Sequence, residues 1–363
     1  MAPPFCRGVL YWRCLVVHPM KTLAAILVEQ KKPLELCEVE LPKLGYGQVL
    51  VEIKATRICG SQIGEIDGVK GPDKYLPHLL GHEAGGVVLE VGPEVRHVSP
   101  GDRVVCHWRP GAGIDAGGSV YSWGDKRVNA GPITTFQKFA VISENRLTKV
   151  PLDTDFELCC LLADTLTTGF GVVARDAGLE IGESAVVIGV GGIGLGTVLG
   201  AHLAGACPVI AVDLHDHKLT KAREFGATHT IHVGREDMAT RVREILGGSA
   251  DAVFDGTGNP EVIQSAWSIT SPKGRVVLVG VMPSDRSLSF NTLPLHYGKR
   301  LIGSEGGASL PSKDIPKLIR ILKGRNISVQ KMISHRVQIL EINKAVSDMR
   351  AGESIHSLVE FNK

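Results

Sequence analysis

Hydrophobic and polar positions follow different patterns in the two halves of the chain. From about residue 22 to residue 150, apolar and polar residues alternate over short runs, which predict strands at 21–28, 49–54 and 86–91. Irregular stretches rich in Gly and Pro separate these runs. We therefore expect a β-rich unit that carries long loops.

Beyond residue 182 the apolar runs become continuous and alternate with helical stretches. Strands that are apolar on both faces and separated by helices indicate a parallel sheet covered on both sides. The predicted strands are 185–188, 209–212, 230–233, 252–254 and 275–279. Helical spacing predicts one helix that ends near residue 204, one at 236–246 and one at 313–324. The predicted fold class is α/β, with a doubly wound parallel sheet beside a β-rich domain and a ligand site in the crevice between them.

Composition excludes several functional classes. Lys and Arg total 40 against 38 Asp and Glu, so the formal charge is only +2 and no nucleic-acid partner is indicated. The eight cysteines are scattered over a long chain, which favours a reduced, cytoplasmic protein over a disulfide scaffold. No stretch approaches the length needed to cross a bilayer, so no membrane partner is expected. Residues 1–19 are interpreted as a disordered extension or an upstream start, with a signal peptide as the alternative.

A glycine-rich motif follows the strand predicted at 185–188. Gly189, Gly191 and Gly194 form a G-x-G-x-x-G pattern that ends this strand and opens a helix, and the next strand ends at Asp213. In this context the pattern predicts a dinucleotide site, because the glycines bring the backbone and a helix N-terminus close to a pyrophosphate. Asp213 is expected to bind the adenosine ribose, which favours NAD over NADP. The alternatives are a tight turn without a ligand and, for Asp213, a solvated carboxylate.

Four motifs occur in a specific order: GHEAGG at 81–86, PGDRV at 100–104, TTGFG at 167–171, and the glycine-rich loop. In these motifs the chain, from about residue 20 to 361, resembles the zinc-dependent medium-chain dehydrogenase/reductase family, the alcohol dehydrogenase-like proteins. The resemblance implies a Rossmann dinucleotide-binding domain and a β-rich, GroES-like catalytic domain that binds zinc. The expected boundaries are 165–303 for the first, and 20–164 with 304–363 for the second.

The resemblance also implies the metal site. It makes Cys59 and His82 ligands of one catalytic zinc, with Glu83 as a neighbouring carboxylate that can enter or leave the coordination sphere. The position of the third ligand falls on Asp164. Three protein ligands and one open position form a catalytic zinc site, and zinc lowers the pKa of bound water to about 7. A bound alcohol is expected to become similarly acidic.

Two further points concern this metal site. Cys159 and Cys160 compete with Asp164 for the third position, although they lie five and four residues too early. Ser61 matches the family's hydroxyl that takes the proton of the alcohol. The expected catalytic residues are therefore Cys59, Ser61, His82, Glu83 and Asp164.

Three features depart from the family. Many members bind a structural zinc through four clustered cysteines, but the stretch 106–130 holds only Cys106, so no structural zinc is expected. Gly64 stands where a relay histidine is common. Gly60 and His356 stand where two arginines commonly hold the pyrophosphate. Cofactor binding is therefore expected to depend on the backbone of the glycine-rich loop and on the helix dipole.

These observations predict a zinc-dependent dehydrogenase that moves a hydride between an alcohol and NAD. Trp108 and Phe136 are the candidate pocket residues, although core packing is the alternative for Trp108. An indole with polar neighbours favours a polyol, cyclitol or sugar derivative as substrate. The expected cofactor-binding residues are Gly189, Gly191, Gly192, Ile193, Gly194, Asp213, Lys218, Thr168, Gly280 and Val281.

The expected partners are a small-molecule alcohol or carbonyl compound and further copies of the chain, as a homodimer or homotetramer. Two other functions remain open from the sequence. The first is a zinc-free quinone or enoyl reductase of the same superfamily, which needs the glycines but not the metal ligands. The second is a non-enzymatic protein that senses the redox state of a dinucleotide.

Overall fold

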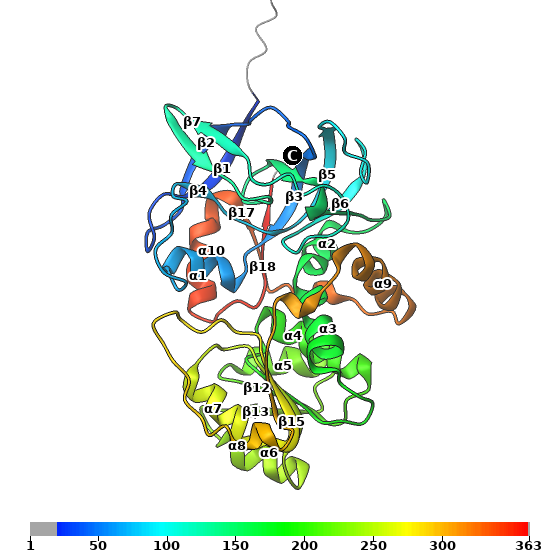
Figure 1. The fold of residues 1–363 in the computed structure, drawn as a ribbon. Coiled ribbons are helices and arrows are strands. Elements are labelled where there is room, and N and C mark those ends of the chain that lie inside the picture. Colours follow the sequence, from blue (N-terminus) through cyan, green and yellow to red (C-terminus); the bar gives the residue numbers. More distant parts are fainter. Residues whose placement is uncertain (1–19, 362–363) are drawn as a thin grey trace, which may run out of the picture.

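The structure is a computed structural model that describes residues 20–361 of the chain. Figure 1 shows a β-rich half and a half built around a parallel sheet, with helices packed where the two halves meet. The extension expected at residues 1–19, including Cys6 and Cys14, lies outside the described residues. The six cysteines of the described part have free thiols, and a reduced protein stays a prediction.

The β-rich half consists of a small closed barrel and a larger sheet. The barrel is formed by β1 (Lys21–Leu27), β2 (Glu35–Glu40), β7 (Val120–Trp123), β8 (Lys126–Asn129) and β4 (His78–Leu79). The larger sheet has the order β10 (Leu147–Lys149), β6 (Arg103–His107), β5 (Glu83–Val91), β3 (Gln48–Arg57), β18 (Ser357–Glu360) and β17 (His335–Gln338), and β9 (Phe139–Ser143) also pairs with β3. Its helices are α1 (Gly60–Asp67) and α10 (Ile342–Arg350).

The second half is a six-stranded parallel sheet of the Rossmann type. Its order is β13 (His229–His232), β12 (Val209–Asp213), β11 (Ala185–Ile188), β14 (Ala250–Asp255), β15 (Thr270–Leu278) and β16 (Arg300–Gly303). The helices between these strands are α4 (Gly192–Ala204), α5 (Asp216–Glu224), α6 (Met238–Leu246), α7 (Pro260–Ile269) and α8 (Leu293–His296). The strand order reverses at β11, and α4 begins just beyond the carboxyl end of that strand, which is where such sheets bind ligands.

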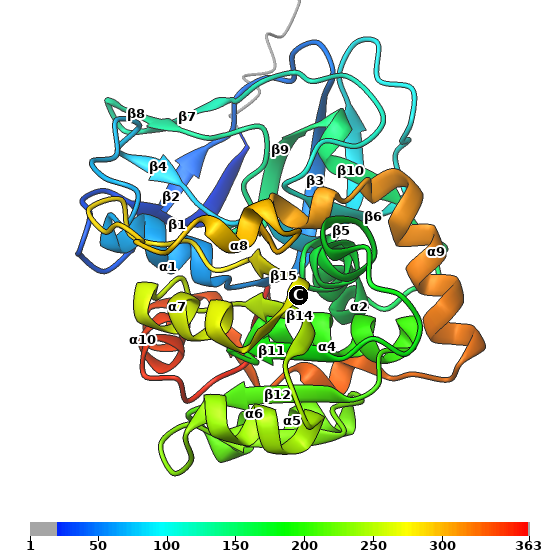
Figure 2. The same cartoon turned by 60° about the horizontal axis from the view of Figure 1, so that its bottom comes forward.

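Helices join the two halves. α2 (Phe156–Ala163) continues through α3 (Thr165–Gly171) into a π-helix (Val172–Ala177), and α9 (Pro311–Gly324) packs beside them. In Figure 2, α2 and α4 lie close to this junction. One hydrophobic core contains residues of α2, α3, α4, α9 and the parallel sheet. The junction is therefore a packed interior rather than a flexible linker.

The sequence-based fold class is confirmed, and most expected elements are present within one to five residues. The helix expected at 236–246 begins at Met238, because the Asp237 side chain caps it by accepting from the Thr240 N–H at 2.8 Å. The helix expected at 313–324 begins at Pro311, since proline suits the first turn. The expectation about membrane spans needs a correction. The helical stretch Phe156–Ala177 is long and apolar enough for a span, but 78% of its apolar window is buried inside the protein.

A buried carboxylate fixes the loop around Ile114, within the stretch 106–130, whose only cysteine is Cys106. Oε1 of Glu144 accepts from the backbone N–H groups of Arg96 and His97 at 2.6 and 2.7 Å, and Oε2 accepts from Ile114 at 2.8 Å. Burial alone would raise the pKa of Glu144, but these N–H donors outweigh it and lower that pKa below its ordinary value. The charge of Glu144 thus joins two loops. The expected absence of a structural zinc stays a prediction.

Replacing Glu144 with glutamine should destabilise the protein by about 1–3 kcal/mol at pH 7, because three backbone N–H groups lose a charged acceptor. The folded-state pKa is depressed, so this contribution is fully present above the unfolded pKa of about 4.3 and is lost as the pH falls through the folded pKa. Urea denaturation at pH 7 and near pH 4 checks both points. Glu261, whose side chain is 70% exposed, is the control, and Glu261→Gln should leave the free energy of unfolding nearly unchanged. An equal loss for Glu144→Gln at both pH values would contradict the assignment.

Candidate metal centre

Cys59 lies at the junction between β3 and α1. It is the N-cap residue of α1, and its backbone N–H donates to Oε1 of Gln62 at 2.7 Å. The side-chain amide of Gln62, which is fully buried, also contacts Nδ1 of His82. Gln62 therefore holds the thiol-bearing residue and the imidazole ring together, and it leaves Nε2 of His82 facing the cluster.

His82 and Glu83 follow a bend that requires glycine. Gly81 has φ +95°, and a Cβ atom at this position would lie 2.3 Å from the hydroxyl of Thr135. No other residue fits this close approach without displacing its neighbours. The bend places His82 just before β5 and Glu83 at its first residue.

Asp164 comes from the helical junction, far from the other residues in sequence. It ends α2 and begins α3, with φ −146° and ψ −53°. Its Oδ2 lies 3.8 Å from Sγ of Cys59 and 4.0 Å from Nε2 of His82. Its Oδ1 accepts from Nε1–H of Trp108 at 3.1 Å and from the hydroxyl of Thr168. One carboxylate oxygen is thus held by the protein, and the other faces the cluster.

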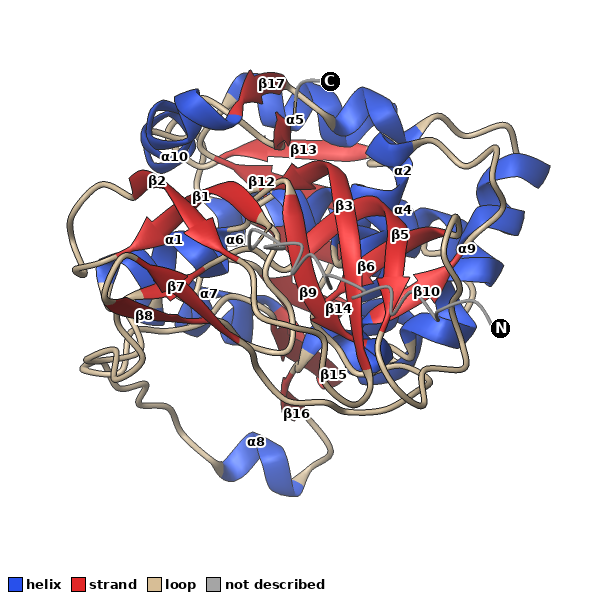
Figure 3. Ribbon diagram, turned by 90° about the horizontal axis from the view of Figure 1, so that it is seen from above, coloured by secondary structure: helices blue, strands red, loops and turns tan. Residues whose placement is uncertain are grey.

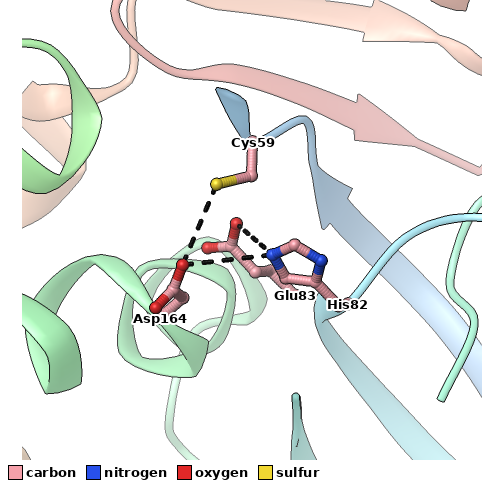
Figure 4. A group of neighbouring side chains, drawn as sticks. All are labelled: Cys59, His82, Glu83 and Asp164. Atoms are coloured by element: carbon pink, nitrogen blue, oxygen red, sulfur yellow. Dashed lines mark hydrogen bonds and ion pairs between the residues drawn. The ribbon is translucent and has the colours of Figure 1, made fainter. Parts of the chain in front are cut away.

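These side chains converge on one point between the two halves. The ligand atoms of Cys59, His82, Glu83 and Asp164 all lie within 4.8 Å of one another, and Figure 4 shows the four groups turned toward a common centre. The hydroxyl of Ser61 lies 3.4 Å from Nε2 of His82. A thiol, an imidazole and carboxylates are the donors that zinc takes in proteins, so the residues fit this metal.

The two competing cysteines lie elsewhere. Cys159 and Cys160 are fully buried in α2, and Sγ of Cys160 donates to the backbone oxygen of Ala55 at 3.2 Å. Burial raises the pKa of Cys159 to about 12 and raises that of Cys160 well above its ordinary range. Neither sulfur belongs to the cluster of ligand atoms that includes Cys59 and His82. The structure brings Asp164 to the cluster instead.

The glycine-rich loop has the form that the sequence predicts. Gly189 has φ +81°, and Gly191 is the N-cap residue of α4 without a side-chain cap. A Cβ atom on Gly194 would lie 2.1 Å from the backbone oxygen of Gly189, so the helix packs directly on the end of β11. Oδ2 of Asp213 accepts from the N–H of Val190 at 3.0 Å, which fixes the carboxylate beside the loop. The backbone amides at the start of α4 remain free to bind an anion.

The other expected cofactor residues occupy different surroundings. Ile193 and Lys218 are half-buried near the start of α4 and on α5. Gly280 approaches the backbone of Gly258 so closely that a Cβ atom would lie 2.4 Å from its nitrogen, and Val281 is exposed. The hydroxyl of Thr168 is used by Asp164. Contact of these residues with a dinucleotide stays a prediction.

The surroundings of the two expected pocket residues differ, and their contact with a substrate stays a prediction. Phe136 has no exposed surface and packs in a core with Ile58 and Leu80. Trp108 donates to Asp164, and its ring lies against Gly306. A cavity of about 1030 Å³ adjoins His82 instead, and its lining includes neither Trp108 nor Phe136. Its polar lining residues include Gln30, Glu65, Lys70, Lys74, His78 and Asn129.

Sequence reasoning missed Arg57, Gln62 and this cavity. Arg57 is the last residue of β3 and is only 1% exposed, with Glu83 and His356 as hydrogen-bond partners. A charged residue within a buried strand was a signal that could have identified it. The cavity lies between segments 64–82 and 118–133, which no local pattern connects.

Comparison with known proteins identifies the family. Residues 45–152 match the alcohol dehydrogenase GroES-like domain, and residues 192–324 match the zinc-binding dehydrogenase domain. The S-(hydroxymethyl)glutathione dehydrogenase of Paracoccus denitrificans is 35% identical over 94% of this chain and 100% of that protein. This chain belongs to the zinc-binding medium-chain alcohol dehydrogenase family. This chain also shares its fold with members of the family whose structures have been solved.

Benzyl alcohol dehydrogenase from Acinetobacter calcoaceticus is 26% identical to this chain. The two structures match with a TM-score of 0.84 over 94% of this chain and 100% of the benzyl alcohol dehydrogenase. The 2R,3R-butanediol dehydrogenase from Bacillus subtilis is 25% identical, with a TM-score of 0.77 over 94% and 100% of the two chains. Together with the cluster of four ligand side chains, this membership makes the protein a zinc-dependent alcohol dehydrogenase.

The contact between Trp108 and Asp164 leads to a prediction. Trp108→Phe keeps the ring but removes the N–H that holds Oδ1, so zinc should be lost to a chelator about 10-fold faster, as for other partners of metal ligands. A colorimetric chelator measures the rate of zinc loss. Trp123→Phe on β7 is the control, because its indole contacts Lys126 and lies outside the cluster. Equal rates in both variants would show that Trp108 does not support the metal ligand.

Proposed function

We propose that the protein transfers a hydride between a hydroxylated substrate, such as a polyol, cyclitol or sugar derivative, and NAD. The observation that carries this proposal is the cluster of Cys59, His82, Glu83 and Asp164. Its His82 lines the cavity, and its Glu83 contacts Arg57, which packs against Gly192 at the N-terminus of α4. The cavity offers room for a substrate, and the N-terminus of α4 offers an anion site for a dinucleotide. The reacting atoms of both would then meet at the cluster.

Each side chain of the centre has a distinct role in this reaction. Cys59, His82 and Asp164 would hold zinc, which supplies a positive charge that polarises the oxygen of the substrate and makes an alcohol more acidic. Ser61, beside His82, accepts the proton that the alcohol releases. Gly64 lines the cavity and offers no side chain to continue a relay, so the proton leaves Ser61 through water in the cavity. Gln62 keeps the imidazole of His82 in place throughout.

Two observations support a dinucleotide at α4. The helix begins with backbone N–H groups that no side chain caps, and the carboxylate of Asp213 is fixed beside them. The buried ring of His356 lies behind Gly192, and its Nε2 has no hydrogen-bond partner among residues 20–361. An unpartnered buried donor next to an anion site is consistent with a missing polar ligand. We infer NAD rather than NADP, because Asp213 would repel a 2′-phosphate.

The cavity supports a substrate larger than a short alcohol. Its volume of about 1030 Å³ exceeds what ethanol fills, and Lys70, Lys74 and Asn129 among its lining residues offer polar contacts. Hydroxyl groups beyond the reacting one would bind these side chains. A short alcohol would leave them solvated and would gain little binding free energy there.

Metal analysis and a substrate panel test this function. The purified protein should hold one zinc per chain, a chelator should abolish activity, and added zinc should restore it. Polyols should be oxidised with a higher kcat/KM than ethanol or propan-2-ol, and NADH fluorescence should report tighter binding than NADPH fluorescence. Activity that survives complete zinc removal would favour a zinc-free reductase. Faster turnover of ethanol or propan-2-ol would rule out the polyol proposal.

We further propose that the protein is a cytoplasmic homodimer or homotetramer. β16 is an edge strand of the parallel sheet, and α8 stands out from the body on two loops in Figure 3. Leu293, Leu295 and Tyr297 are exposed on and beside this helix, and an apolar surface of this kind is typical of an interface. Sedimentation velocity of Leu293→Glu should show smaller particles than the unchanged protein. Unchanged particle size would place the interface elsewhere.

A further inference from the structure

The metal centre contains one more donor side chain than a catalytic site requires. The four ligand side chains within 4.8 Å of one another would satisfy a tetrahedral zinc completely. A zinc with four protein ligands is closed, as in structural sites, and offers no position to a substrate. Something in this chain must therefore keep one of the four donors away from the metal.

Glu83 is the donor that the surrounding protein already engages with both oxygens. Nε of Arg57 donates to Oε2 at 2.9 Å, and Nη2 donates to Oε1 at 2.6 Å. Oε1 of Glu83 also lies 3.6 Å from Nε2 of His82, but it already accepts from Arg57. Asp164 differs, because its Oδ2 faces only the candidate ligands Cys59 and His82, while Trp108 donates to its Oδ1. The two-point contact with Arg57 is the strong, planar form of a carboxylate–guanidinium pair.

Arg57 is itself fixed and has no access to solvent. Its side chain is 1% exposed, and Nη1 donates to Nδ1 of His356 at 2.9 Å. A Cβ atom on Gly192 would lie 2.9 Å from Nη1 of Arg57, so the glycine-rich loop covers the guanidinium. If Glu83 moved to the metal, it would leave this buried charge without its carboxylate. Leaving a buried charge unpaired is strongly unfavourable.

We propose that Arg57 is a positioning residue that holds Glu83 off the metal and so keeps the fourth coordination position open to the substrate. The inference rests on the proposed zinc function, and it assigns to this chain a residue that no motif of the family identifies. Glu83 then balances the charge of Arg57 in the resting site, and Cys59, His82 and Asp164 are the three resident ligands.

Cobalt in place of zinc makes the coordination visible, because the absorption spectrum of Co²⁺ responds to the number and kind of its ligands. In the unchanged protein, added imidazole should enter the open position and alter the spectrum. In Arg57→Met, Glu83 should take that position, so imidazole should bind at least about 10-fold more weakly. The bound metal should be retained, and kcat should fall while the metal content stays at one per chain.

Two further variants separate this role from a role in folding. Arg57→Met combined with Glu83→Gln removes both charges and the competing ligand, so the response to imidazole should return. Arg57→Lys keeps the charge but loses the two-point contact, and its response should be intermediate. If Arg57→Met does not fold, the double variant and Arg57→Lys still give the comparison. An unchanged spectrum and imidazole affinity in Arg57→Lys and in any folded Arg57→Met would overturn the inference. Failure of the unchanged protein to bind metal would instead overturn the proposed function.

Discussion

Replacing Cys59 with alanine is expected to remove zinc and activity together. In the proposed site Cys59 would be one of three resident ligands drawn from distant segments, and Oδ2 of Asp164 lies 3.8 Å from its sulfur. Loss of a partner that merely supports a ligand costs about 10–100-fold in metal affinity, so loss of the ligand itself should exceed 100-fold. Zinc content by atomic emission and kcat/KM of the purified variant measure the effect.

Cys160→Ala is the matched control for this substitution. Cys160 is also a fully buried cysteine near Asp164 in sequence, but its sulfur donates to the backbone oxygen of Ala55. Its removal should leave zinc content unchanged and lower only the free energy of unfolding, because a small cavity remains. Retention of zinc by Cys59→Ala, or its loss from Cys160→Ala, would show that the metal site is wrongly assigned.

Two alanine substitutions in the glycine-rich loop should differ in their effect on stability. At Gly194 a Cβ atom would lie 2.1 Å from the backbone oxygen of Gly189, so α4 must move away from β11. Alanine gains about 1 kcal/mol of helix propensity over glycine, but overpacking against rigid backbone costs about 1–3 kcal/mol or more. We therefore expect Gly194→Ala to lower the melting temperature and to weaken NADH binding.

Gly191→Ala should instead affect binding alone. A Cβ atom at this position meets nothing within 4 Å, and its φ of −72° is open to any residue. The free energy of unfolding should therefore change by no more than about 0.5 kcal/mol. The added methyl group would occupy the space in front of the α4 N-terminus, so NADH binding should weaken. Thermal denaturation and NADH fluorescence of both variants test this contrast, which fails if Gly191→Ala binds NADH normally.

The sequence was sufficient where the signal is local. Continuous apolar runs predicted the strands of the parallel sheet, because a strand buried on both faces needs apolar residues at every position. The glycines of the loop likewise act on their immediate neighbours. Resemblance to a family then related Cys59, His82 and Asp164, which are separated by up to 105 positions.

The tertiary structure decided the features that depend on contacts between distant segments. Phe136 packs in a core built from distant segments, which the sequence does not specify, and its role in a substrate pocket stays a prediction. Trp108 became a support for Asp164, and Arg57 became the partner of Glu83, across 56 and 26 positions respectively. Such pairs leave no periodic pattern, because each depends on where whole strands and helices pack. The sequence by itself determined the fold class and the kinds of side chain at the metal site. Only the packed structure decided which neighbouring side chains hold each of these groups in place.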